Sequence, residues 1–260
     1  MKILLQDIDN VSYPFKEKHT EYLVNQGLLS EGVADAFLNS NKPYLIDFLL
    51  SELKNGGCVA DVVERIRSKN GSKVQLVKSM LVEKNLSQLG EEYLDLEAVF
   101  FSTFQDFFES DYYTKGVIEE ITTLNKSLKS DYPDLKIFGI TARAVHAKKE
   151  PDLFNYLTSL THDWNVKNNA YLDGIFFENK KIRAYKEILD NHPFHDVVCF
   201  VEDDPRNIED FLKEGVNCVL IDYEFHGNED LANKLSKKYP GKLDVVSSHA
   251  DASDVIKKLI

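Results

Sequence analysis

The part of the chain after residue 136 alternates short apolar runs with helical segments, and this alternation constrains the fold more than any other feature of the sequence. Short apolar runs are typical of buried strands, and strands that alternate with helices build parallel sheets covered on both faces. We therefore expect an α/β fold with a doubly wound parallel sheet. The runs lie at 137–140, 171–177, 196–201, 216–221 and 243–248, and the expected helices at 149–161, 181–190, 205–214, 228–238 and 251–259.

One more strand is expected at the N-terminus, where the run KILLQ covers residues 2–6. Between this strand and the next, apolar residues recur at helical spacing, with breaks at Asn55-Gly56-Gly57 and Asn70-Gly71. A segment rich in phenylalanine, 91–109, is interpreted as a helix with a core-facing stripe. The pattern predicts a core domain interrupted by an all-helical insertion. The expected domains are a core of residues 1–14 and 112–260, and an insertion of residues 15–111.

The composition excludes several classes of protein. The chain has 260 residues, with 43 acidic and 31 basic side chains and a formal net charge of −12, which disfavours binding to nucleic acid polymers or anionic membranes. No segment approaches the roughly 20 apolar residues that cross a bilayer, and the N-terminal apolar run is too short for a signal peptide. The three cysteines are widely spaced and form no Cys-x-x-Cys pair. We expect a cytoplasmic protein.

Polar residues follow the predicted strands at their carboxyl ends, where open parallel sheets bind ligands. Taken singly, several have a structural explanation. Asp204 before Pro205 is a standard helix start, and for Thr141 alone a helix cap and a functional role are equally consistent with the sequence. The residues concerned are Asp7 and Asp9, Thr141 and Arg143, Lys180 and Lys181, and Glu202, Asp203 and Asp204.

Their combination points to chemistry. Asp7, Asp9 and Asp203 would meet at one edge of the sheet, where two carboxylates about 4 Å apart repel by roughly 4 kcal/mol at an effective dielectric of 20. A positive group must lie between them. Mg²⁺ takes one or two carboxylates together with the oxygens of a phosphate, and a nearby threonine and lysine would bind the remaining phosphate oxygens.

The order of these motifs resembles the haloacid-dehalogenase-like (HAD) hydrolase superfamily. LLQDIDNVSYP at 4–14 is similar to the family's strand ending in Asp-x-Asp, in the form seen in nucleotidase-like members. IFGITAR at 137–143 is similar to its strand ending in threonine, and VVCFVEDDPRN at 197–207 to its acidic strand end. For the family's lysine at a helix start, Lys181 is preferred because an apolar helix face follows it, and Lys180 is the alternative. The insertion is placed like a C1-type cap.

The resemblance implies a Mg²⁺-dependent phosphatase that hydrolyses a small phosphomonoester through an aspartyl-phosphate, with a nucleoside monophosphate as the favoured class. It implies that Asp7 is the nucleophile and that Asp9 protonates the leaving oxygen and then activates water. Arg143 is expected either at an anionic substrate or in a surface ion pair. The implied phosphate-holding residues are Thr141 and Lys181 or Lys180, and the implied metal-binding residues are Asp7, Asp9 through its carbonyl, Asp203 and, as support, Asp204.

Two positions depart from the family pattern. Val11 stands where the first motif usually has threonine, and Glu202 stands where many members have glycine. Loss of the hydroxyl near the nucleophile motivates an alternative function, a non-catalytic protein that keeps the fold as a binding or phosphoacceptor module. Because Asp9 is present, phosphatase chemistry is favoured over dehalogenation.

Overall fold

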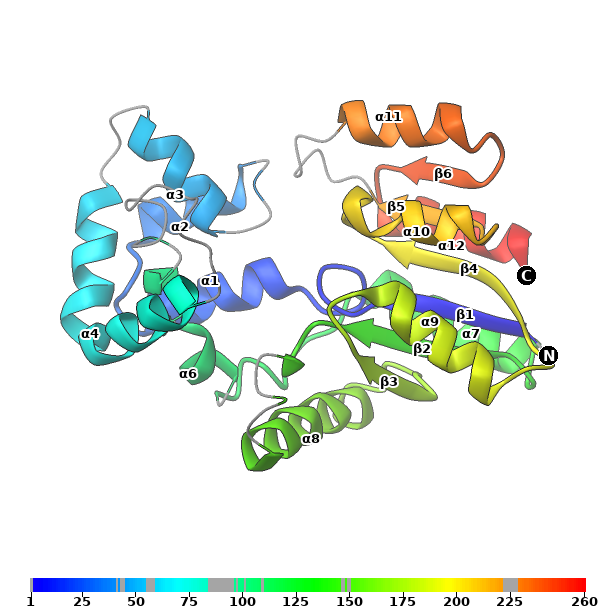
Figure 1. Ribbon diagram of the computed structural model, residues 1–260, viewed down its shortest axis with the longest axis horizontal. Coiled ribbons are helices and arrows are strands. Elements are labelled where there is room, and N and C mark those ends of the chain that lie inside the picture. Colours follow the sequence, from blue (N-terminus) through cyan, green and yellow to red (C-terminus); the bar gives the residue numbers. More distant parts are fainter. Residues whose placement is uncertain are drawn as a thin grey trace. The chain divides into compact units, whose positions relative to one another are not determined.

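The computed structural model describes residues 2–40, 42, 45–54, 59–83, 96, 98–100, 102–108, 110–145, 148, 151–221 and 229–260. The chain divides into two compact units, which are described separately (Figure 1). The core unit comprises Met1–Phe15 and Thr114–Ile260, and the helical unit comprises Lys16–Tyr113. That the helical unit acts as a cap over the site stays a prediction.

The core unit is built on a parallel six-stranded sheet with the order β3-β2-β1-β4-β5-β6. β1 lies inside the sheet, paired with β2 on one side and β4 on the other, so the direction of winding reverses between β1 and β4. Ligands bind at such a switch point, beyond the carboxyl ends of the strands. The strands are β1 (Lys2–Asp7), β2 (Lys136–Thr141), β3 (Gly174–Phe177), β4 (Asp196–Glu202), β5 (Cys218–Ile221) and β6 (Leu243–Val246).

Helices cover both faces of this sheet (Figure 1). One face of the sheet buries a continuous apolar cluster against α9, α10 and α11, which with the 3₁₀ turn η3 form the first group of helices. The other face packs against α7 and α12. The expected α/β class, a doubly wound parallel sheet with an inserted helical segment, is confirmed. The first group is α9 (Lys181–Asn191), the 3₁₀ turn η3 (Pro205–Asn207), α10 (Glu209–Lys213) and α11 (Glu229–Lys238); the others are α7 (Glu119–Asp131), α12 (His249–Leu259) and, beside β3, α8 (Pro151–Lys167).

Each strand expected from the sequence is present, and the differences lie at strand ends. The third strand begins at Gly174, not at residue 171, because Tyr171 has a left-handed backbone with φ 61° that cannot continue a strand. Gly174 packs directly beneath the Phe138 ring, where an added Cβ would lie 3.3 Å from it. The helix expected at 149–161 is longer than predicted, since α8 continues to Lys167.

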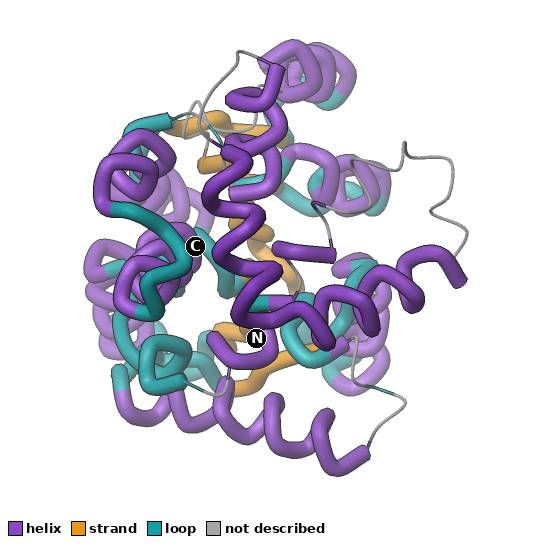
Figure 2. The backbone as a smooth tube through the Cα atoms, turned by 90° about the vertical axis from the view of Figure 1, so that its left-hand side faces the viewer, coloured by secondary structure: helices purple, strands orange, loops and turns teal. Residues whose placement is uncertain are grey.

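The helical unit has its own aromatic core; Figure 2 draws all helices of the chain, in both units, as purple tubes. The buried His19 ring of α1 contacts Phe100, Phe104 and Phe107, so the phenylalanine stripe packs as core. The rest of the helix predicted at 91–109 lies partly outside the described residues. The helices of this region are α1 (Phe15–Asn25), α2 (Glu31–Leu38), α3 (Leu45–Lys54), α4 (Val59–Glu83) and α6 (Phe104–Phe108).

The break predicted at Asn70-Gly71 is confirmed as a kink, at which two helical stretches meet. α4 continues through it, with a non-helical backbone at Asn70 (φ −118°, ψ 22°). Glycine is a poor helix former, and kinks commonly occur beside such residues. In the described part of the chain, no helix combines the length and the apolar character needed to span a bilayer.

Candidate active site

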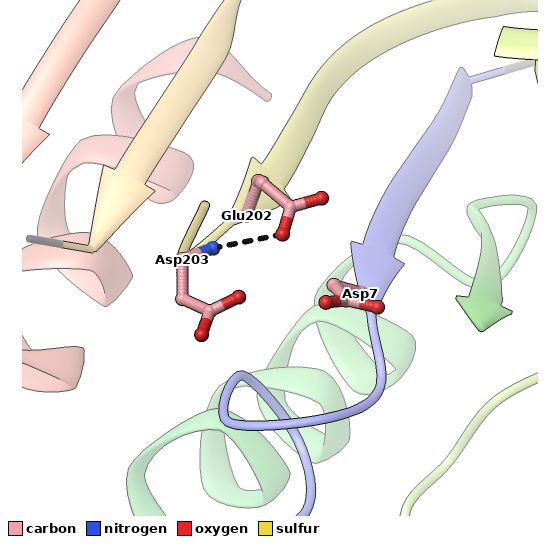
Figure 3. A group of neighbouring side chains, drawn as sticks. All are labelled: Asp7, Glu202 and Asp203. Atoms are coloured by element: carbon pink, nitrogen blue, oxygen red, sulfur yellow. Dashed lines mark hydrogen bonds between the residues drawn. The ribbon is translucent and has the colours of Figure 1, made fainter. Parts of the chain in front are cut away.

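The carboxyl ends of β1 and β4 bring three carboxylates together (Figure 3). Asp7 is the last residue of β1, Glu202 is the last residue of β4, and Asp203 follows directly. One carboxylate oxygen from each of the three lies within 4.8 Å of the others, and all three residues are buried. The acidic cluster therefore forms at the switch point of the sheet.

Strand alternation explains which way two of these side chains point. Ile3 and Leu5 of β1 belong to the apolar cluster beneath α9, so Asp7 lies on the same face two residues later. Phe200 belongs to that cluster as well, which places Glu202 on the same face of β4. Both carboxylates thus point toward the beginning of α9.

Lys181 lies at the beginning of α9 and contacts both carboxylates. Its Nζ is 2.7 Å from Asp7 Oδ2 and 2.7 Å from Glu202 Oε2, and the lysine side chain is 8% exposed. Lys180, the alternative, is the N-cap residue of α9 and is exposed. Lys181 is therefore the lysine that reaches the acidic cluster.

The electrostatics of this cluster are dominated by burial. Burial and the neighbouring Glu202 raise the pKa of Asp7 well above its usual value, against the effect of Lys181. Burial likewise raises the pKa of Glu202 to about 7. Burial alone would lower the pKa of Lys181, but the carboxylates of Asp7, Glu202 and Asp203 outweigh it and raise that pKa. The lysine is thus held as an ammonium ion.

The loop after β1 fixes the nucleophile candidate and links it to β4. Asp7 Oδ1 accepts a hydrogen bond from the Ile8 backbone N–H at 2.8 Å. Asn10 has a left-handed backbone (φ 57°), a conformation that asparagine tolerates, and its Nδ2 donates to Asp203 Oδ2 at 3.2 Å. Val11 is fully buried, and the next residue supplies a hydroxyl: Ser12 Oγ lies 3.3 Å from the carbonyl oxygen of Asp7.

A second group forms around Asp9, whose carboxylate lies outside the acidic cluster. Thr141 Oγ1 donates to Asp9 Oδ2 at 3.2 Å, and Arg143 Nε and Nη2 both donate to Asp9 Oδ1, at 2.9 and 2.5 Å. The Arg143 backbone N–H in turn donates to Thr141 Oγ1 at 3.0 Å. Four of the residues predicted for the site thus form two adjoining pairs, Asp7 with Lys181 and Asp9 with Arg143, with Thr141 beside the second.

Asp204 is not among the three residues of the acidic cluster. Its Oδ1 accepts from the backbone N–H of Arg206 at 2.9 Å, and its carboxylate pairs with the Arg206 guanidinium. It is the N-cap of η3, as the Asp-Pro pattern indicated. A direct ligand role for Asp204 has no geometric support, and its predicted supporting role stays a prediction.

The donor set of the acidic cluster fits a hard divalent cation. Three carboxylates and one ammonium give the cluster a formal charge of −2, which a Mg²⁺ ion would neutralise, and oxygen is the ligand type that Mg²⁺ prefers. The residues that would hold it are Asp7 and Asp203, with Glu202 close by.

Sequence reasoning missed the part that Glu202 plays. It was treated as a departure at a glycine position, whereas the structure makes it the fully buried partner of Lys181. The sequence indicated only its place at the carboxyl end of β4, because the strand is apolar on both faces and its pattern does not assign side chains to the α9 side. The contact of Asn10 with Asp203 was missed too, because it depends on the left-handed turn at Asn10.

No family model and no curated protein matches the chain. Among solved structures, a protein designated beta-phosphoglucomutase from Thermotoga maritima is 13% identical over 100% of both chains, with a TM-score of 0.48. The L-2-haloacid dehalogenase from Xanthobacter autotrophicus is 9% identical over 100% of both chains, with a TM-score of 0.48. A protein designated phosphoglycolate phosphatase from Lactobacillus delbrueckii subsp. bulgaricus is 12% identical over 98% of this chain and 97% of that one, with a TM-score of 0.47. Likeness at this level does not assign a function, which has to be argued from the site.

Proposed function

We propose that this protein is a Mg²⁺-dependent phosphatase of the HAD type that hydrolyses a small phosphomonoester through an aspartyl-phosphate on Asp7. One observation carries the proposal: a buried aspartate at the switch point contacts a buried lysine and shares an acidic cluster with Asp203. A structural ion pair would need one carboxylate for the lysine. The carboxylates in excess of the lysine are the ligands that a Mg²⁺ ion would require, and the bound ion together with the lysine would then attract the phosphate.

In the first half of the proposed reaction, a carboxylate oxygen of Asp7 attacks the phosphorus atom. The bond from phosphorus to the leaving oxygen breaks, and that oxygen takes a proton from Asp9. Lys181 and the Thr141 hydroxyl bind the oxygens of the transferring phosphoryl group and offset the charge that develops on them. When bound, Mg²⁺ would add charge stabilisation at the same oxygens.

In the second half, water attacks the phosphorus atom of the aspartyl-phosphate. Asp9 accepts a proton from that water, and the bond between phosphorus and Asp7 breaks to regenerate the carboxylate. Glu202 touches no reacting atom in this scheme. It holds Lys181 in place and shares the ammonium charge with Asp7.

The finer proposal for the substrate is a nucleoside monophosphate. It is supported by the first motif alone, in which Asn10 and Tyr13-Pro14 match the nucleotidase-like form. The net charge of −12 favours a small phosphorylated molecule over a nucleic acid polymer as partner.

The test is phosphate release from an aryl phosphate and from a panel of nucleoside monophosphates, with and without Mg²⁺. We expect metal-dependent turnover that Asp7→Asn abolishes. The matched control is Asp134→Asn, which removes an exposed carboxylate from the loop before β2 and should leave turnover unchanged. Turnover that is independent of metal, or full activity of Asp7→Asn, would refute the proposal.

The second candidate function is a non-catalytic binding or phosphoacceptor protein, which Val11 favours because a buried valine replaces the usual hydroxyl. Beryllium trifluoride, a mimic of the phosphoryl group, separates the two. Trapping of the mimic on the protein without turnover of any phosphomonoester favours the second function, whereas trapping together with turnover favours the phosphatase.

A further inference from the structure

The Arg143 guanidinium hydrogen-bonds to one carboxylate oxygen of Asp9, and the Thr141 hydroxyl hydrogen-bonds to the other. Both Nε and Nη2 of Arg143 donate to Oδ1, while Oδ2 accepts the Thr141 hydroxyl at 3.2 Å. The two oxygens of the carboxylate are therefore not equivalent. Oδ1 is paired with a permanent positive charge, and Oδ2 is the oxygen on the side of the residue that is proposed to hold the phosphate.

The guanidinium is itself fixed by aromatic rings. The Arg143 Cζ lies 4.3 Å from the centroid of the Tyr13 ring and 5.6 Å from that of Trp164, and these two rings pack edge to face with centroids 5.9 Å apart. Trp164 is anchored by its Nε1–H, which donates to the Gly116 carbonyl at 2.7 Å. Stacking between aromatic faces suits arginine in particular, because its guanidinium is planar and delocalised.

The backbone directly after Arg143 adopts an uncommon conformation. Ala144, the next residue, has a left-handed backbone with φ 60°, which is uncommon for a residue with a Cβ. Strained backbone of this kind persists only where its surroundings hold it, and it clusters at functional sites. Here it directly follows the residue whose N–H donates to Thr141 and whose side chain donates to Asp9.

We propose that Arg143 is a positioning residue that confines the transferable proton of Asp9 to Oδ2. This role rests on the proposed function. With Oδ1 bound to the guanidinium, a proton on Asp9 resides on Oδ2. That proton passes to the leaving oxygen as its bond to phosphorus breaks, and Oδ2 receives a proton from the attacking water as the bond between phosphorus and Asp7 breaks. Arg143 makes and breaks no bond, so the balance of the reaction is unchanged.

This role replaces the two that were expected from the sequence. A surface ion pair is wrong, because the Arg143 side chain is 2% exposed and its partner lies in the site. A direct substrate contact is the competing role, and positioning is preferred because two donors of the guanidinium are already engaged by Asp9. The two roles differ in what they predict: a substrate contact governs binding, whereas a positioning residue governs proton transfer.

The experiment compares two substrates that differ in their need for a proton. Dinitrophenyl phosphate has a leaving group that departs without protonation, and a simple alkyl phosphate has one that does not. The variant Arg143→Met keeps the length of the side chain between the rings and removes its donors. Arg143→Lys keeps a charge without the two-pronged donor, and Arg65→Met, an exposed arginine of α4, is the matched control.

We expect Arg143→Met to lower kcat/KM for the alkyl phosphate by about 100-fold or more, the size of a general acid contribution, and to change kcat/KM for dinitrophenyl phosphate by less than about threefold. Asp9→Asn should show the same pattern, Arg143→Lys should fall between, and Arg65→Met should match the wild type. Melting curves separate a loss of fold from a loss of proton transfer, and if Arg143→Met is unfolded, Arg143→Lys carries the comparison.

Equal losses on the two substrates would overturn the positioning role in favour of a merely structural one. A raised KM with unchanged kcat would overturn it in favour of a substrate contact. If the wild type turns over neither substrate with Mg²⁺, the proposed function and this role fail together, whereas turnover by the wild type with equal losses in Arg143→Met refutes the role of Arg143 alone.

Discussion

Binding of Mg²⁺ should stabilise the folded protein, and removing Asp203 from the acidic cluster should abolish that effect. The cluster carries three carboxylates against one ammonium. Their ligand oxygens lie within 4.8 Å of one another, and at that distance two carboxylates repel by about 3.5 kcal/mol at an effective dielectric of 20. The metal-free cluster is therefore an electrostatic strain that a divalent cation relieves.

The expected size follows from linkage. A ligand at 100 times its dissociation constant that binds only the folded state stabilises it by about 2.7 kcal/mol. For a domain of about 150–250 residues, 1 kcal/mol moves Tm by about 2–4 °C, so saturating Mg²⁺ should raise Tm by about 5–11 °C. Asp203→Asn keeps a side-chain oxygen for the hydrogen bond from Asn10 and removes one charge. Its Tm without metal should be no lower than that of the wild type.

The assay is thermal unfolding followed by circular dichroism at pH 8, above the pKa of about 7 for Glu202. Wild type, Asp203→Asn and the exposed control Asp134→Asn are each melted with EDTA and across a Mg²⁺ titration. The control should shift like the wild type. No shift of the wild type at millimolar Mg²⁺, or an unchanged shift in Asp203→Asn, would show that the acidic cluster does not bind the ion.

Three further changes have expected outcomes. Burial lowers the pKa of His19 to about 3, so its unfolded form binds a proton below pH 6.5 and stability should fall with decreasing pH; His19→Leu should reduce that slope by up to about 1.4 kcal/mol per pH unit, measured by urea unfolding from pH 6.5 to 4, and an unchanged slope would contradict it. Lys181→Met leaves buried carboxylates uncompensated and should destabilise the metal-free protein by about 3–5 kcal/mol in the same assay, whereas a smaller loss than for an exposed lysine would argue against the buried pair. Gly139→Ala places a Cβ 2.9 Å from side-chain atoms of Ile8 and Leu172 and should cost about 1–3 kcal/mol, and a neutral result would show that these side chains move aside freely.

The sequence predicted the sheet well because its strands are buried on both faces. Such strands appear as continuous apolar runs, for example VVCFV in β4. The start of β3 was predicted too early because a single backbone angle decides it: Tyr171 delays β3 through its left-handed conformation. No periodic pattern reports such angles.

The candidate site, like the sheet, was predictable in its grouping of residues but not in its detailed contacts. The grouping of Asp7, Lys181 and Asp203 follows from parallel topology, which brings strand ends and the beginning of α9 to one edge. Glu202 was missed because strands buried on both faces lack the alternation of polar and apolar residues that shows which face of the sheet each side chain points to. The two hydrogen bonds from Arg143 to Asp9 were not predictable, because they join the loops after two different strands and no residue pattern indicates such a contact.

The most direct test of the account is to locate the phosphoryl group during turnover. The wild type is mixed with substrate and Mg²⁺, quenched in acid and reduced with borohydride, which converts an aspartyl-phosphate to homoserine, and the peptides are then read by mass spectrometry. We predict homoserine at position 7 only when substrate and metal are both present. Continued turnover with Asp7 unmodified in the quenched protein, or modification at another carboxylate, would contradict the assignment of Asp7 as the nucleophile.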